Sequence, residues 1–161
     1  MTYINKPFTY PLDIVAFHNC SSAVISASSV VKPQTSATLA GSPQSSINTS
    51  SGVITLPNTQ CLLIGSIMYK NTDSSSYARF RWYDVTNSQY IGSIGQISGL
   101  DPERAGTISG AVSCDEEAIA IAQNIQVKLV ITAVSSNDLT IDGSHSHGIY
   151  AGKTRLLVYE F

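Results

Sequence analysis

From residue 52 onward, apolar side chains recur at every second position, in short runs separated by polar turn sequences. The clearest run covers residues 127–134, where Val, Leu, Ile and Ala occupy the odd positions. A period of two is typical of β-strands, because successive side chains of a strand point to opposite faces of its sheet. Six to eight such runs in about 110 residues predict one all-β domain, an antiparallel sandwich or jelly roll.

Two kinds of strand are predicted. Residues 61–69 are apolar at both alternating sets of positions, which indicates a central strand with both faces covered. Residues 77–83 carry Ala78, Phe80 and Trp82 on one side and arginines and tyrosines on the other, so we expect this strand to be half-buried. The two-sided runs 61–69 and 126–134 also favour oligomerisation, since a sheet with one wet face would show polar alternates.

Charge is scarce along this chain. Charged residues make up 12% of it and the formal net charge is −2, whereas a typical domain has about 25% charged residues. Ser and Thr together supply 37 of the 161 residues, so hydroxyls replace charge at the surface. We therefore expect no nucleic-acid partner. The longest apolar stretch, Cys61 to Tyr69, is far shorter than the roughly 20 residues of a membrane helix, so we expect no membrane partner either.

Composition changes near residue 52. Residues 1–51 hold only three charged side chains and several Ser-rich stretches, which predicts an extended N-terminal arm and Ser/Thr-rich linker (1–51) ahead of a β jelly-roll domain (52–161). Within the arm, residues 3–17 crowd apolar and aromatic side chains around two prolines, and an exposed patch of that kind is normally covered. We expect the covering partner to contact Tyr3, Ile4, Phe8, Tyr10, Leu12 and Phe17.

What covers the arm stays open on the sequence alone. It could grip a viral shell or neighbouring subunits, swap between protomers, or pack on its own β domain as an additional strand. The chain begins without a basic segment followed by an apolar run, so no secretory signal is expected and synthesis in a cytoplasm is the default.

No complete catalytic or metal-binding set is present in the sequence. It has no Gly-x-Ser-x-Gly, no His-Glu-x-x-His and no phosphate-binding glycine loop, so we expect neither an enzyme nor a cofactor. His145 and His147 would share one face of an extended segment and could reach a metal together with Asp142. Glycines at both ends of that segment favour a plain loop, so we expect no metal site.

Two further groups of residues allow predictions. The three cysteines, Cys20, Cys61 and Cys114, are odd in number and far apart, which predicts free and mostly buried thiols. Arg79 and Arg81, with Tyr77 and Tyr83, form either a contact face for a sugar or a protein, or the ordinary outer face of a strand.

Several stretches resemble a known family. They are Leu56-Pro57 followed by Cys61-Leu62-Leu63-Ile64, the run Ala78-Arg79-Phe80-Arg81-Trp82-Tyr83-Asp84-Val85-Thr86-Asn87, then Ile91-Gly92, and finally Arg155-Leu156-Leu157-Val158-Tyr159-Glu160. Over residues 54–161 this pattern resembles a domain of bacteriophage structural proteins. The resemblance implies a trimeric jelly roll, similar to tumour-necrosis-factor (TNF) and complement globular heads, of the kind found in tail fibres and capsid decoration proteins.

The resemblance therefore leads us to expect a non-enzymatic virion protein. The first hypothesis is a homotrimeric capsid decoration or cement protein, anchored by its arm to the major capsid protein or another virion protein, and assembled in the host bacterial cytoplasm. The alternative is the receptor-binding tip of a tail or head fibre that recognises a host glycan or surface protein. Length favours the first, because about 51 residues without heptads leave little room for a fibre shaft.

Overall fold

A computed structural model describes residues 13–18, 20, 23–24, 26–71, 77–98, 108–113, 117–120, 125–135, 140–141 and 154–161. The strands are β1 (Asp13–His18), β2 (Ala23–Val24), β3 (Thr35–Ala40), β4 (Ser46–Asn48), β5 (Val53–Thr55), β6 (Gln60–Asn71), β7 (Tyr77–Asp84), β8 (Gln89–Ser98), β9 (Ile108–Ser113), β10 (Glu117–Ala120), β11 (Gln126–Val134), β12 (Thr140–Ile141) and β13 (Arg155–Glu160). This part of the chain contains no helix, and hence none that could cross a membrane.

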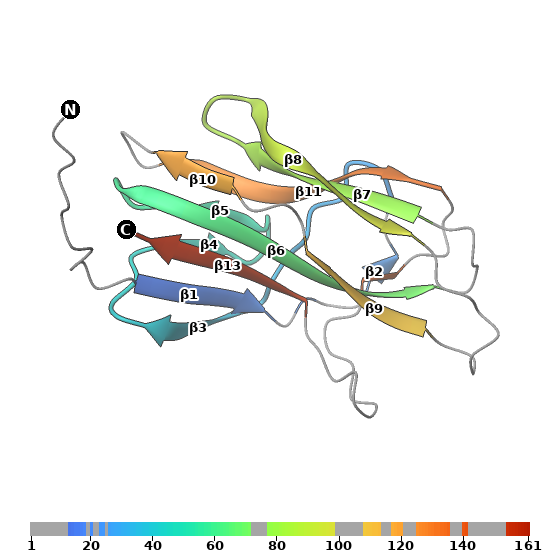
Figure 1. Ribbon diagram of the computed structural model, residues 1–161, viewed down its shortest axis with the longest axis horizontal. Helices are drawn as coiled ribbons and strands as arrows, with labels where there is room; N and C mark the ends of the chain where they lie inside the picture. Colours follow the sequence, from blue (N-terminus) through green and yellow to red (C-terminus); the bar gives the residue numbers. More distant parts are fainter. Residues whose placement is uncertain are drawn as a thin grey trace, which may run out of the picture.

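The strands form two antiparallel sheets that pack as a sandwich (Figure 1). In sheet A the hydrogen-bonded neighbours run β2-β12-β6-β13-β1-β3. Strands β12 and β13 pair with successive parts of one edge of β6, and β9 and β10 pair with its other edge. Sheet B has the order β4-β5-β11-β7-β8. The predicted all-β antiparallel sandwich is confirmed, and so is the central position of the strand predicted over 61–69, which is β6.

The core lies between the two sheets. Strand β7 turns Ala78, Phe80 and Trp82 into it, each at most 1% exposed, as the alternation in the sequence predicts. The largest fully buried side chains come from both sheets and from the segments next to them: Trp82, Phe17, Phe80, Ile54, Leu56, Leu63, Ile67, Leu129 and Ile131.

The division of the chain at residue 52 is wrong for the residues that the structure describes before it. Strand β1 lies inside sheet A, between β13 and β3, and Phe17 is 1% exposed in the core. Residues 28–31 run beside β11, with the amide of Val31 donating to the carbonyl of Leu129 at 3.0 Å. The division at residue 52 is wrong because β1 pairs with a strand at the far end of the chain, with Asp13 opposite Glu160. Of the alternatives for the arm, packing on its own domain holds for residues 13–18.

Two carboxylates hold the loop that carries the chain from β3 in sheet A to β4 in sheet B. The carboxylate of Glu160, which is 5% exposed, accepts hydrogen bonds from the amides of Gln44 and Ser45, at 2.9 and 2.8 Å. Asp13 Oδ1 accepts one from the amide of Ser42 at 2.8 Å. Gly41 has a φ of +64°, and a Cβ there would overlap with Asp13 Oδ1. The loop therefore depends on Asp13 and Glu160, which lie opposite each other at one end of the β1–β13 pair.

The first prediction concerns this loop. Glu160→Gln leaves one acceptor oxygen in place of two and turns an NH2 group toward backbone donors, so we expect a loss of about 1.5–3 kcal/mol in the free energy of unfolding. Urea unfolding at pH 7 measures it. Lys32→Gln removes a charge from an exposed site and should change stability by less than about 0.5 kcal/mol. Equal midpoints for Glu160→Gln and the wild type would show that the hydrogen bonds to the Glu160 carboxylate add nothing to stability.

Candidate binding surfaces

One candidate surface is the outer side of sheet A. Residues aligned across β6, β13 and β1 alternate in direction: the column Leu63, Val158 and Val15 lies in the core, and the columns on either side point outward. We call these outward residues the apolar face: Ile14, Ala16, Leu62, Ile64, Leu157 and Tyr159.

The apolar face contains no charged side chain. Ala16 and Leu157 are buried, and the other four residues are half-buried. The next column along carries Arg155 and His18 opposite each other and marks one end of the face. A continuous apolar surface of this kind on a sheet is typical of an interaction site.

A second candidate surface lies on the outer side of sheet B. It is formed by alternate residues of β7 and by their partners on the strands at either side, and the register places Tyr83 opposite both Tyr90 and Lys128. We call it the cation–tyrosine face, and it consists of Tyr77, Arg79, Arg81, Tyr83, Tyr90 and Lys128. The sequence predicts the four members from β7 but not Tyr90 or Lys128, because those two come from other strands.

Each cation of this face lies over a tyrosine ring. The guanidinium carbon of Arg79 is 5.5 Å from the centroid of Tyr77, and that of Arg81 is 5.7 Å from the centroid of Tyr90. Lys128 Nζ is 5.3 Å from the centroid of Tyr83. The rings of Tyr83 and Tyr90 meet edge to face at 5.1 Å and 74°. These contacts hold long side chains in a fixed arrangement on the sheet surface.

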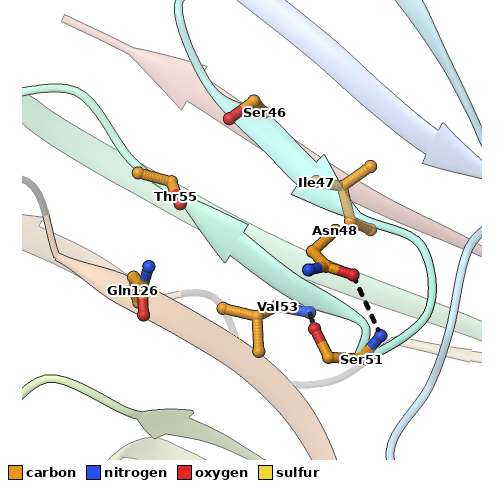
Figure 2. A pocket seen from close by; sticks show the side chains of 7 residues that line it. All are labelled: Ser46, Ile47, Asn48, Ser51, Val53, Thr55 and Gln126. Carbon is orange, nitrogen blue, oxygen red and sulfur yellow. Dashed lines mark hydrogen bonds between the residues drawn. The ribbon is translucent and has the colours of Figure 1, made fainter.

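A third feature is a hollow of about 460 Å³ beside the β4–β5 hairpin. Figure 2 shows the side chains that line it. Two of its polar side chains already serve the hairpin turn: Asn48 Oδ1 accepts from the amides of Ser50 and Ser51, and Ser51 Oγ accepts from the amide of Val53. The hollow is lined by Ser46, Ile47, Asn48, Ser51, Val53, Thr55 and Gln126.

Some of the residues singled out from the sequence lie within the described ranges, and others lie outside them. Of the six expected partner contacts, Phe17 lies in the core instead, while Tyr3, Ile4, Phe8, Tyr10 and Leu12 lie outside the described residues. Asp142, His145 and His147 also lie outside them. Within the described ranges, no three His, Cys, Asp or Glu side chains gather where they could hold a metal ion.

Comparison with known proteins shows similarity at the level of fold. No protein-family model matches the chain, and no curated protein matches its sequence. The structure of Eiger TNF from S. frugiperda matches with a TM-score of 0.57 and 9% identity, covering 94% of this chain and 94% of that one. The crystal structure of murine APRIL at pH 8.5 matches with a TM-score of 0.57 and 8% identity, covering 93% of this chain and 99% of that one. The chain has a TNF-like jelly-roll fold.

A prediction follows for the thiols. Burial raises the pKa of Cys20 and Cys61 to about 12, and at Cys61 the charge of Glu160 adds to the effect of burial. Thiols of the unfolded chain ionise near pH 9. Burial of the neutral thiols therefore contributes fully to stability below about pH 9, and this contribution is lost as the pH rises toward 12.

Burial of the thiols is tested in the Cys114→Ser variant, which keeps Cys20 and Cys61 as its two cysteines. At pH 8 the native protein should not react with a disulfide reagent within minutes, because its thiols are buried and protonated. The same protein in 6 M guanidinium should react at both sites at once. Rapid labelling of the native protein would contradict the burial of Cys20 and Cys61.

Proposed function

We propose that this chain is a non-enzymatic structural protein of a bacteriophage particle, and that it acts as a homotrimeric decoration or cement protein on the capsid. The observation that supports this most is the uncharged apolar face on the outer side of sheet A. The bacteriophage context comes from the sequence resemblance over residues 54–161. The proposed location is the virion, after assembly in the host bacterial cytoplasm, and the proposed partner is the major capsid protein or another virion protein.

Self-association explains why sheet A is apolar on both sides. A single sandwich needs apolar residues only on the inner faces of its sheets, and its outer faces usually carry polar side chains. Here Leu62, Ile64 and Tyr159 remain partly exposed on the outer face of one chain. Burying such residues gains about 25 cal/mol per Å² of apolar area, which favours a complex of copies that share this face. The family resemblance implies that the copies number three.

The proposed anchor precedes β1. Residues 13–18 are paired on both edges within sheet A, so they are not available to bind a capsid. Tyr3, Ile4, Phe8, Tyr10 and Leu12 remain as the candidate contacts with a virion partner. Three such segments in one trimer would act together, so a modest affinity of each would give tight attachment through effective concentration.

The homotrimer is tested by placing a charge on the apolar face. Light scattering at micromolar concentration should give about three times the 17.2 kDa chain mass for the wild type. Ile64→Lys should give a folded monomer or a much weaker trimer, because an unpaired charge in an apolar interface costs several kcal/mol. Ser93→Lys adds the same charge to an exposed position of β8 and should remain trimeric. A monomeric wild type, or a trimer unaffected by Ile64→Lys, would contradict the proposal.

The anchor is tested by deleting residues 1–12. The deletion ends before β1, so we expect the truncated protein to fold, to melt within a few degrees of the full chain and to remain trimeric, while no longer binding phage particles that lack it. A full-length variant with Tyr3→Ser, Phe8→Ser and Tyr10→Ser should also lose attachment. Undiminished binding by either variant, measured by co-sedimentation with particles, would show that the anchor lies elsewhere.

A second candidate function is a receptor-binding head that recognises a host surface glycan or protein. The cation–tyrosine face favours it, because half-exposed rings and charged donors on a flat sheet surface are the groups that recognition sites use. The two candidates differ in where the protein acts, and both use the same trimer.

A further inference from the structure

We propose that the cation–tyrosine face binds an acidic polysaccharide, with its arginines and lysine on the carboxylates of the sugar chain and its tyrosines against the sugar rings. The inference names the ligand class for the recognition function proposed above and rests on it. Three observations carry it: positive charge with no carboxylate partner among the described residues, guanidinium groups held through Nε alone, and a tyrosine ring beside each cation.

Among the described residues, the positive charge on this face has no carboxylate partner. In the described part of the chain, no carboxylate pairs with Arg79, Arg81 or Lys128. The carboxylate in the same strand, that of Asp84, is 4% exposed and accepts hydrogen bonds from the amide and the side chain of Asn87. Three of the nine Lys and Arg residues lie on this face, although the chain as a whole has a net charge of −2. A surface of this kind attracts an anionic ligand.

Both guanidinium groups are held in place by a hydrogen bond from Nε. Arg79 Nε donates to Gln96 Oε1 at 2.9 Å, and Arg81 Nε donates to the carbonyl of Gly92 at 2.8 Å. These bonds use the nitrogen nearest the chain and leave the two terminal nitrogens of each group for a ligand. Those nitrogens form a planar fork that matches the two oxygens of a carboxylate. Because the forks are already oriented, less side-chain entropy is lost on binding.

The spacing suits a linear ligand with repeated negative charges. Arg79 and Arg81 are successive outward residues of β7, and such positions recur roughly every 6.8 Å along a strand. Tyr90 is 46% exposed, and its ring lies beside Arg81. Aromatic ring faces carry partial negative charge, which attracts the polarised C–H groups of a sugar, and the phenol hydroxyl can bond sugar hydroxyls.

The same face suits an acidic peptide less well. Extended peptides bind mainly by adding a strand to the edge of a sheet, where backbone groups are unpaired. Four of the six residues of this face, including both arginines, project from the surface of β7, which is already paired on both edges, by β8 and β11. Side chains alone must then supply the binding, and they offer charge, rings and hydroxyl groups.

The test uses octagalacturonate, a linear chain of eight carboxylated sugars, and its fully methyl-esterified form, which has the same sugars without the charge. By isothermal titration calorimetry in low salt, the wild-type protein should bind octagalacturonate at least tenfold more tightly than the ester, and 150 mM NaCl should weaken the binding several-fold. Arg79→Gln and Tyr90→Leu should each weaken it about tenfold. Lys32→Gln removes an exposed charge outside the face and should leave it unchanged.

Several outcomes would overturn the inference. Equal binding of the two octasaccharides would mean that the face recognises neutral sugar. Equal or tighter binding of octaglutamate, or of an eight-nucleotide single-stranded DNA, would mean that charge alone is recognised. Binding unaffected by both variants would place the ligand elsewhere. Light scattering on the same samples reports the trimer separately, so a trimer that binds neither octasaccharide would refute the acidic-sugar site and leave the structural function standing.

Discussion

Strand β6 is hydrogen-bonded along both of its edges, and this pairing shapes the rest of sheet A. Along one edge it pairs with β13 and β12, and along the other with β10 and β9. Because β6 is an interior strand, its outward residues have neighbours on the adjacent strands. Leu62 and Ile64 therefore lie beside the outward residues of β13, which in turn lie beside those of β1. The same arrangement brings the last strand of the chain between β6 and β1, so both ends of the described chain enter one sheet.

The strands after residue 52 could be predicted because their signal is local. Alternation along β7 identifies Ala78, Phe80 and Trp82 as inward and the arginines as outward, and each side chain lies where the pattern predicts. The two-sided run that becomes β6 indicates its central position for the same reason. In these segments the amount of apolar area on each side of a strand decides which side is buried, and that can be counted from the sequence.

The strands before residue 52 could not be predicted in the same way. Strands β3 and β4 are short, rich in Ser and Thr and largely exposed, so they lack an apolar alternation. Strand β1 is apolar, but its partners are at the far end of the chain, as the pairing of Asp13 with Glu160 shows. The cation–tyrosine face was predicted in part for a related reason. Its β7 members follow from alternation, whereas Tyr90 and Lys128 depend on the register between strands.

The two candidate surfaces belong to different sheets, and this decides how they can be used together. The core lies between sheets A and B, so the outer side of one faces away from the outer side of the other. If copies of the chain associate through the apolar face of sheet A, that face turns toward the symmetry axis. The cation–tyrosine face of sheet B then turns outward on every copy. Assembly through one face would thus present the other to solvent three times over, and a repetitive polysaccharide could contact more than one copy, with a gain in affinity that no single face provides.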